Sequence, residues 1–130
     1  MFERIGLRLL QSVNPELAHN IALRYLRMKI DFSKNSYEYP KLKTVLAGIR
    51  LQNPLGLAAG FDKNAIALKS LSNLGFGFIE VGAVTPLPQR GNPKPRLFRI
   101  KNEKAIINRF GFNNDGMIKI NERLRKFRKK

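Results

Sequence analysis

The sequence predicts an α/β fold in which two amphipathic helices precede a strand–helix–strand unit. Three observations support this prediction. Apolar residues recur at helical spacing in the first 30 residues, and this period is lost after Lys43. Further along, two short apolar runs, 55–59 and 78–84, flank a helical pattern at 62–74. Two strands joined by a helix within about thirty residues are typical of a βαβ unit with parallel strands.

Two helices are predicted at the start of the chain, over residues 2–13 and 15–30. Asn14 and Pro15 mark the start of the second, because an Asn side chain can cap free backbone amides and proline has the φ angle of a first helical turn. This helix has two apolar stripes, one made of Leu17, Ile21, Tyr25 and Met28, the other of Leu23, Leu26 and Ile30 in line with His19. We expect one stripe to face the protein and the other to stay uncovered, as on a membrane surface or in an ordinary helix hairpin.

The connecting segments are also predictable. Residues 31–42 are polar and contain a proline, which indicates a linker. A small hairpin is expected around the turn at 47–48, and a second one is expected to pair 97–100 with 105–108. The loop 86–95 holds four of the seven prolines, so it should be stiff.

The strand–helix–strand unit has features of a ligand site. The strand 55–59 ends in small residues, and Asp62 is predicted to cap the helix 62–74, which Gly75 ends. Small residues at a strand end let a flat ligand approach the backbone, because glycine has no Cβ. Lys63 would then meet the negative charge of such a ligand.

The chain is strongly basic. It has 25 Lys and Arg against nine Asp and Glu, a net charge of +16, which predicts attraction to nucleic acid, anionic lipid or an anionic cofactor. A last helix, capped by Asn114 or Asp115, is predicted to run into the basic end. Seven basic residues lie in the last twelve positions: Lys119, Arg123, Arg125, Lys126, Arg128, Lys129 and Lys130.

Several kinds of site are excluded by composition. Without cysteine, the chain has no disulfide, no thiolate metal site and no cysteine nucleophile. Because His19 is the single histidine, a metal site built on paired histidines and a serine–histidine triad are excluded as well. No apolar stretch approaches the roughly 20 residues that span a bilayer, and the N-terminus does not read as a secretory signal.

Four stretches together resemble one family, the membrane-associated, quinone-using class 2 dihydroorotate dehydrogenases of pyrimidine synthesis. They are NPELAH (14–19), NPLGLAAGFDKN (53–64), GFGFIEVGAVTPLPQRGNPKPRLFR (75–99) and INRFGFNN (107–114), in the family's order and close to its spacing. The N-terminal helix pair separates this class from the soluble ones. The resemblance implies an oxidoreductase that uses FMN to oxidise dihydroorotate to orotate and passes the electrons to membrane quinone.

The resemblance also implies a fold, the N-terminal part of a TIM (β/α)8 barrel with FMN at the C-terminal ends of its strands. Residues 1–30 would be a membrane-associating helix pair that forms the quinone tunnel, 31–42 a linker, and 43–130 the first part of the barrel. A complete barrel takes about 250 residues, so we expect an incomplete one in this chain. The expected location is peripheral, at the cytoplasmic face of the cell membrane if the source is bacterial.

The resemblance assigns roles to residues of these stretches. For FMN they are Ala59, Gly60, Phe61, Asp62, Lys63 and Ala83. For orotate they are Lys63, Asn108, Arg109, Phe110, Gly111 and Phe112. His19 and Arg99 match polar positions near the inner end of the quinone tunnel. The family usually has a hydroxyl residue at the position of Ala83, so we expect a lost hydrogen bond of about 1 kcal/mol to weaken FMN binding several-fold.

The catalytic base of this class is a serine on a later barrel loop, and no serine of this chain has the matching context. We therefore assign no catalytic residue, expect no metal, interpret the chain as the N-terminal third of the enzyme, and expect no turnover by it alone. Two other classes stay open: a non-catalytic basic membrane-surface module, and a small nucleic-acid-binding protein. The latter would explain the charge, but its aromatic residues would interleave with the basic ones.

Overall fold

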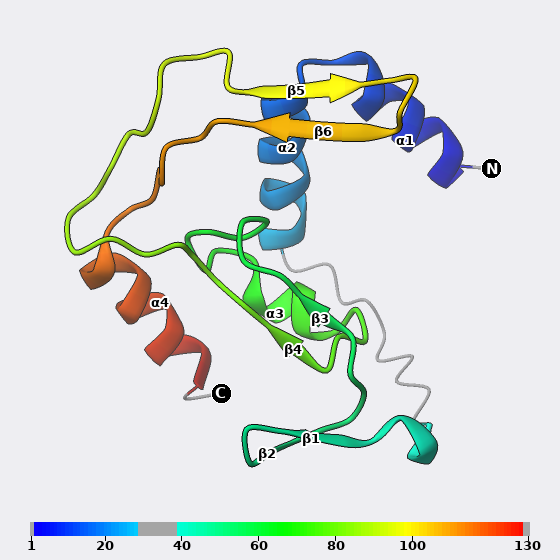
Figure 1. Ribbon diagram of the computed structural model, residues 1–130, viewed down its shortest axis with the longest axis vertical. Coiled ribbons are helices and arrows are strands. Elements are labelled where there is room, and N and C mark those ends of the chain that lie inside the picture. Colours follow the sequence, from blue (N-terminus) through cyan, green and yellow to red (C-terminus); the bar gives the residue numbers. More distant parts are fainter. Residues whose placement is uncertain (1, 29–38, 129–130) are drawn as a thin grey trace.

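The computed structural model of the chain describes residues 2–28 and 39–128 (Figure 1). Predictions made for Ile30, for residues 31–38, and for Lys129 and Lys130 lie outside these residues. In chain order the elements are α1 (Phe2–Ser12), α2 (Pro15–Arg27), η1 (Pro40–Leu42), β1 (Thr44–Leu46), β2 (Ile49–Leu51), β3 (Gly56–Leu57), α3 (Leu68–Ser72), β4 (Phe78–Ile79), β5 (Leu97–Ile100), β6 (Ala105–Asn108) and α4 (Met117–Arg128). Within the described residues, the strands form three two-stranded sheets.

The predicted helix pair is present. The Asn14 side-chain oxygen accepts hydrogen bonds from the amides of Glu16 at 3.0 Å and Leu17 at 3.2 Å, which confirms the predicted cap of α2. Leu23 is buried against the core, whereas the other apolar stripe is exposed: Leu17, Ile21, Tyr25 and Met28. One stripe of α2 is therefore uncovered, as predicted. In the part of the chain that the structure describes, neither this helix nor any other has the length and apolar character needed to cross a membrane.

Both predicted hairpins are confirmed. β1 and β2 pair antiparallel around Ala47 and Gly48, whose φ angles of 48° and 79° are those of a left-handed turn. β5 and β6 pair over the predicted residues, with Leu97 opposite Asn108. The β5–β6 hairpin lies beside α2, away from the other two sheets (Figure 1).

The predicted parallel pair is formed by β3 and β4. Gly56 lies opposite Phe78, and Leu57 lies opposite Ile79, so each strand is shorter than the apolar run that predicted it. A Cβ at Gly56 would come within 2.1 Å of the Phe78 ring. The glycine therefore allows this aromatic ring to cover β3, and the pair carries α3 on one side (Figure 1).

The helix predicted over 62–74 is wrong in its first half, because α3 begins only at Leu68. Ala65 has a φ of 55°, a left-handed conformation that cannot continue an α-helix. Asp62 is no N-terminal cap of α3, since its carboxylate accepts hydrogen bonds from the amides of Ile66 at 2.9 Å and Ala67 at 2.8 Å. These contacts hold a compact irregular turn where the periodicity predicted helix.

The start of α4 also differs from the prediction. α4 begins at Met117, so the residue directly before the helix is Gly116 and not Asn114 or Asp115. The Asn114 side chain accepts the amide N–H of Gly116 at 2.9 Å instead. The Asp115 carboxylate pairs with Arg123 of α4 at 2.6 Å. Gly116 has a φ of 81°, and this left-handed turn is the reason why the helix starts later.

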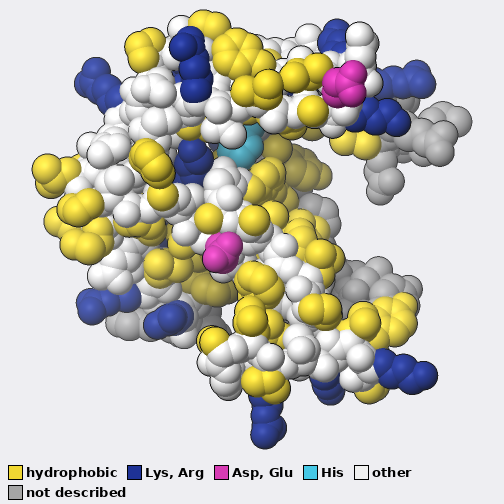
Figure 2. All heavy atoms as spheres, in the orientation of Figure 1, with side chains coloured by type: hydrophobic (Ala, Val, Ile, Leu, Met, Phe, Trp, Pro, Cys, Tyr) yellow, Lys and Arg dark blue, Asp and Glu magenta, His cyan; other side chains and the backbone are white. Residues whose placement is uncertain are grey.

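The core is small and centred on α3. Leu71 of α3 packs with Leu23 of α2, and Leu68 packs with Ile120 of α4. Much apolar surface is left outside this core, and Figure 2 shows hydrophobic side chains spread over the visible face, with Lys and Arg side chains toward its edges. The side chains of α3 therefore connect α2 with α4.

Replacing Leu71 by alanine tests this arrangement. We expect Leu71→Ala to lower the free energy of unfolding by about 3 kcal/mol, because the side chain is 1% exposed and its loss leaves a cavity between α2 and α3. Leu74→Ala removes the same atoms from a side chain that is 45% exposed, and should cost less than about 1 kcal/mol. Urea unfolding measures both values. Equal losses in the two variants would contradict the packing described.

Candidate functional site

An open pocket of about 400 Å³ lies where the chain leaves β3, β4 and β6. Its lining residues are Ala59, Gly60, Lys63, Gly82, Ala83, Asn108, Arg109, Phe110, Gly111 and Phe112. The structure therefore brings together all the residues predicted to bind orotate and most of those predicted to bind FMN. Because β3 and β4 are parallel and adjacent, their carboxyl ends meet at one edge, which makes the segments that follow them neighbours.

The floor of the pocket has no large side chains. Gly60 and Gly82 have φ angles of 111° and 112°, which side-chain-bearing residues rarely adopt. A Cβ added to Gly60 would have no atom within 4 Å, so it would project into open space. Ala59 and Ala83 complete this floor. The surface suits a flat ring that lies close to the backbone.

Lys63 supplies a partly buried positive charge at this pocket. Its ammonium nitrogen donates to the Asn113 side-chain oxygen at 2.8 Å and lies 4.1 Å from the centre of the Phe110 ring. Burial lowers the pKa of Lys63, and the nearby charge of Arg96 lowers it further, whereas Glu16 raises it. The side chain is thus held by neighbours on another segment, in a place where it can meet an anion.

Phe61 and Asp62, both predicted to line the flavin, lie elsewhere. The Phe61 ring meets the His19 ring edge-on, with centres 5.2 Å apart, and packs on the core below α2. The Asp62 side chain is fully buried and holds the turn after β3. Both residues line a smaller polar cavity of about 60 Å³, and Lys63 and Phe110 line this cavity as well as the open pocket.

The side chains of residues 108–112, the segment predicted to bind orotate, differ in their exposure to solvent. Asn108 and Phe112 are exposed at the pocket, and Phe112 has a left-handed φ of 56°. The Arg109 guanidinium donates to the Pro95 carbonyl at 3.1 Å, so this cation is tied to the proline-rich loop. The backbone N–H of Asn92 donates to the Phe110 carbonyl at 2.9 Å, so the proline-rich loop also holds the backbone of this segment in place.

Sequence reasoning missed two asparagines that organise the pocket. Asn113 holds Lys63, as described above. Asn114 is buried, donates to the Thr85 hydroxyl at 2.9 Å and to the Phe112 carbonyl at 2.7 Å, and so ties the segment after β6 to the segment after β4. Both asparagines belong to the INRFGFNN stretch. Their position in that motif was the available signal, but their partners are distant in the chain.

Comparison with known proteins identifies the family. A family model described as dihydroorotate dehydrogenase matches residues 41–130, more than half of the chain. The chain belongs to the dihydroorotate dehydrogenase family. A curated relative from Cereibacter sphaeroides, named dihydroorotate dehydrogenase (quinone), is 52% identical over 124 residues, which are 95% of this chain and 35% of the relative. One of the same name from Rhodospirillum rubrum is 51% identical over 88% of this chain and 31% of the relative.

The chain spans about a third of the length of these dihydroorotate dehydrogenases. A crystal structure of the Eimeria tenella dihydroorotate dehydrogenase in complex with ferulenol matches with a TM-score of 0.84 and 42% identity, over 95% of this chain and 33% of that one. The ligand-free form from the same organism matches with a TM-score of 0.81. The predicted fold class is confirmed at this level: an α/β chain that corresponds to the N-terminal part of the dihydroorotate dehydrogenase barrel.

His19 and Arg99, the residues predicted for the quinone tunnel of a class 2 dihydroorotate dehydrogenase, lie in different cavities. His19 lines the small polar cavity with Lys63. Arg99 lines an open groove of about 770 Å³ between α1 and the β5–β6 hairpin. Its guanidinium donates to the carbonyls of Leu10 at 2.9 Å and Val13 at 2.7 Å, where it complements the negative end of α1.

The titration of His19 reports on the charge of Lys63. Burial lowers the pKa of His19, and the Lys63 charge lowers it further. In an NMR titration of the single histidine, we expect a midpoint below the usual value of about 6.5, and Lys63→Gln should move that midpoint upward. Lys69→Gln removes the charge of an exposed lysine of α3 that does not line this cavity, and it is the control. An unchanged midpoint in Lys63→Gln would contradict the geometry of the small cavity.

The same shift has a consequence for stability. The folded chain disfavours the charged imidazole of His19. Its contribution to the free energy of unfolding is therefore complete at a pH above the pKa of an exposed histidine. This contribution is lost as the pH falls through the lower pKa of His19 in the folded state.

Proposed function

We propose that this chain forms one wall of the FMN and orotate site of a quinone-dependent dihydroorotate dehydrogenase, which oxidises dihydroorotate to orotate in pyrimidine synthesis. One observation carries the proposal: a single pocket gathers the segments that follow two parallel strands, a floor of small residues and Lys63. The curated relatives that carry this enzyme name support it, since they match nearly the whole chain.

The residues of the pocket fit FMN. Glycine and alanine at 59–60 and 82–83 leave room for a flat ring against the backbone, and Lys63 places a cation beside it. When bound, FMN supplies the hydride-accepting chemistry. Lys63, whose ammonium is held by Asn113, would stabilise negative charge on a bound reduced flavin.

The same pocket offers partners for orotate. Orotate carries a carboxylate, which a lysine ammonium binds, and a pyrimidine ring with both donors and acceptors. The Asn108 side chain is exposed and its amide can donate and accept. Phe112 is 67% exposed at the pocket and provides apolar surface for the ring. These residues bind and orient the substrate, and no proton transfer is assigned to them.

The helix pair is proposed to lie on a membrane surface and to admit quinone. The uncovered stripe of α2 supports this, together with exposed Leu7 and Leu9 of α1 and the basic Arg24 and Arg27 of α2. In a bacterial cell such a surface would bind the cytoplasmic face of the membrane. In this proposal His19, on α2, and Arg99, on β5, contact the quinone from separate cavities.

The barrel in this chain is proposed to be incomplete and to lack the base. The described serine hydroxyls donate to backbone carbonyls, namely Ser12 to Arg8, Ser70 to Leu26 and Ser72 to Lys69. None of these three serines lines the open pocket. Addition of dihydroorotate to the chain in the presence of FMN should therefore leave the flavin yellow, and measurable formation of orotate would overturn this part of the proposal.

Binding of FMN tests the pocket itself. We expect Lys63→Met to weaken FMN binding by about tenfold, equivalent to about 1.4 kcal/mol, because it removes the cation beside the ring. Lys69→Met is the matched control, since Lys69 is an exposed lysine of α3 outside the pocket. Quenching of FMN fluorescence measures both constants. If both variants weaken binding equally, the flavin is attracted by the net charge of +16 and not held by the pocket.

A further inference from the structure

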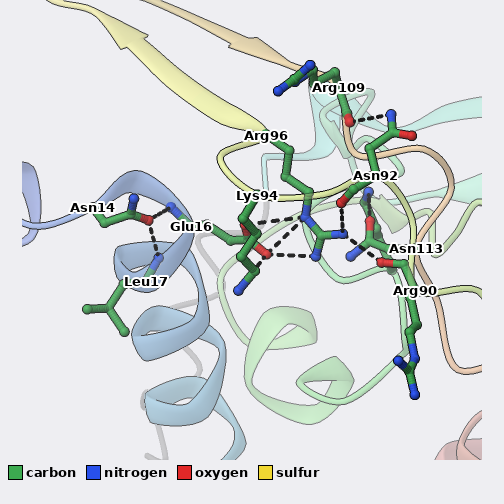
Figure 3. Close-up of polar contacts among 10 residues, drawn as sticks. Asn14, Glu16, Leu17, Arg90, Asn92, Lys94, Arg96, Arg109 and Asn113 are labelled. Atoms are coloured by element: carbon green, nitrogen blue, oxygen red, sulfur yellow. Dashed lines mark hydrogen bonds and ion pairs between the residues drawn. The ribbon is translucent and has the colours of Figure 1, made fainter.

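A buried ion pair joins α2 to the loop that precedes β5. The Arg96 guanidinium approaches the Glu16 carboxylate through Nη2 at 2.8 Å and Nε at 3.2 Å, and both side chains are 9% exposed (Figure 3). Burial raises the pKa of Glu16, but the hydrogen bonds and charge of Arg96 outweigh it, so the pKa lies below its ordinary value. Glu16 is therefore ionised at neutral pH and faces the Arg96 guanidinium as a carboxylate.

The opposite edge of Arg96 is held by the proline-rich loop. Its Nη1 donates to the Arg90 carbonyl at 2.6 Å and to the Asn92 carbonyl at 3.1 Å. Figure 3 shows the guanidinium between these carbonyls and Glu16. With both edges bound, the guanidinium plane has a fixed place and orientation.

The fixed guanidinium lies against an aromatic ring of the pocket. Its central carbon is 5.2 Å from the centre of the Phe110 ring, and the same ring lies 4.1 Å from the ammonium of Lys63. There is little room for adjustment here. A Cβ at Gly91 would come within 2.1 Å of the Phe110 carbonyl and 2.9 Å of both Arg96 Nη1 and the Asn113 side chain.

We propose that Glu16 and Arg96 are positioning residues for Lys63, acting through the Phe110 ring that Arg96 and Lys63 share. The first turn of α2 thereby sets the place of the Lys63 ammonium. The inference rests on the proposed function only for the ligand that the open pocket binds. Neither residue of the ion pair lines the open pocket itself.

The charges around Lys63 make the proposal specific. Arg96 faces it from the loop before β5, Glu16 and His19 face it from α2, and Asp62 precedes it in the chain. Arg96 lowers the pKa of Lys63 and Glu16 raises it, with Arg96 the stronger of the two. Removal of Arg96 should therefore raise the pKa of Lys63, and removal of Glu16 should lower it. If the ion pair only stabilised the fold, the two removals would not shift this pKa in opposite directions.

The test follows Lys63 by NMR in the full chain with 13C-labelled lysine, the Lys63 signal being assigned by Lys63→Arg. We expect Glu16→Gln to lower the midpoint of the Lys63 titration and Arg96→Met to raise it. Lys94→Met is the matched control: its ammonium lies 3.4 Å from Glu16 but is 67% exposed, and the midpoint of Lys63 should not move. Contacts between Phe110 and Lys63 protons should persist in the control and be lost in Arg96→Met.

A double variant keeps the test valid if a lone buried charge unfolds the chain. Glu16→Gln with Arg96→Met leaves no unpaired charge, and it should raise the midpoint less than Arg96→Met alone. Equal midpoints in all variants, or shifts of one sign, would overturn the proposal. Since no flavin is present in this experiment, its outcome is independent of FMN binding, and the proposed function can fail separately.

Discussion

The buried carboxylate of Asp62 is the contact on which the site depends. It accepts the amide hydrogens of Ile66 and Ala67 and is fully enclosed, so the chain after β3 must turn back on itself before α3 can begin. This turn directs Phe61 toward α2 and Lys63 toward the open pocket. Each hydrogen bond to a buried carboxylate stabilises by about 1.5–3 kcal/mol, enough to hold the strained Ala65 in place.

Two arginines of one short segment attach both N-terminal helices to the rest of the molecule. Arg96 pairs with Glu16 at the start of α2, and Arg99 binds the last carbonyls of α1. A chain with 25 basic and nine acidic residues has few carboxylates to offer, and it uses backbone carbonyls as further partners. The helix pair is thus joined to the pocket through charge and hydrogen bonds, while much of its apolar surface stays uncovered.

The sequence predicted the elements whose cause is local. The Asn14 cap and both hairpins follow from neighbouring residues, and the parallel pair follows from two apolar runs. The helix predicted over 62–74 is wrong in its first half because Ala65 is left-handed and the Asp62 carboxylate binds the amides of the two residues after it, contacts that periodicity cannot show. The same holds for α4, whose start depends on how Asn114 meets Gly116.

Some residues of the candidate site could be predicted from the sequence, and others could not. The pocket residues could be named from motifs, because they follow strands that meet at one edge, yet Phe61 and Asp62 lie away from it. Asn113 and the Glu16–Arg96 pair could not be predicted, since their partners are 50 and 80 residues away. The most direct measurement is an NMR map of the amide shifts that FMN causes in the full chain. We predict shifts centred on residues 59–60, 63, 82–83 and 108–112, which line the pocket, whereas shifts centred on the basic face of α4 would contradict the site.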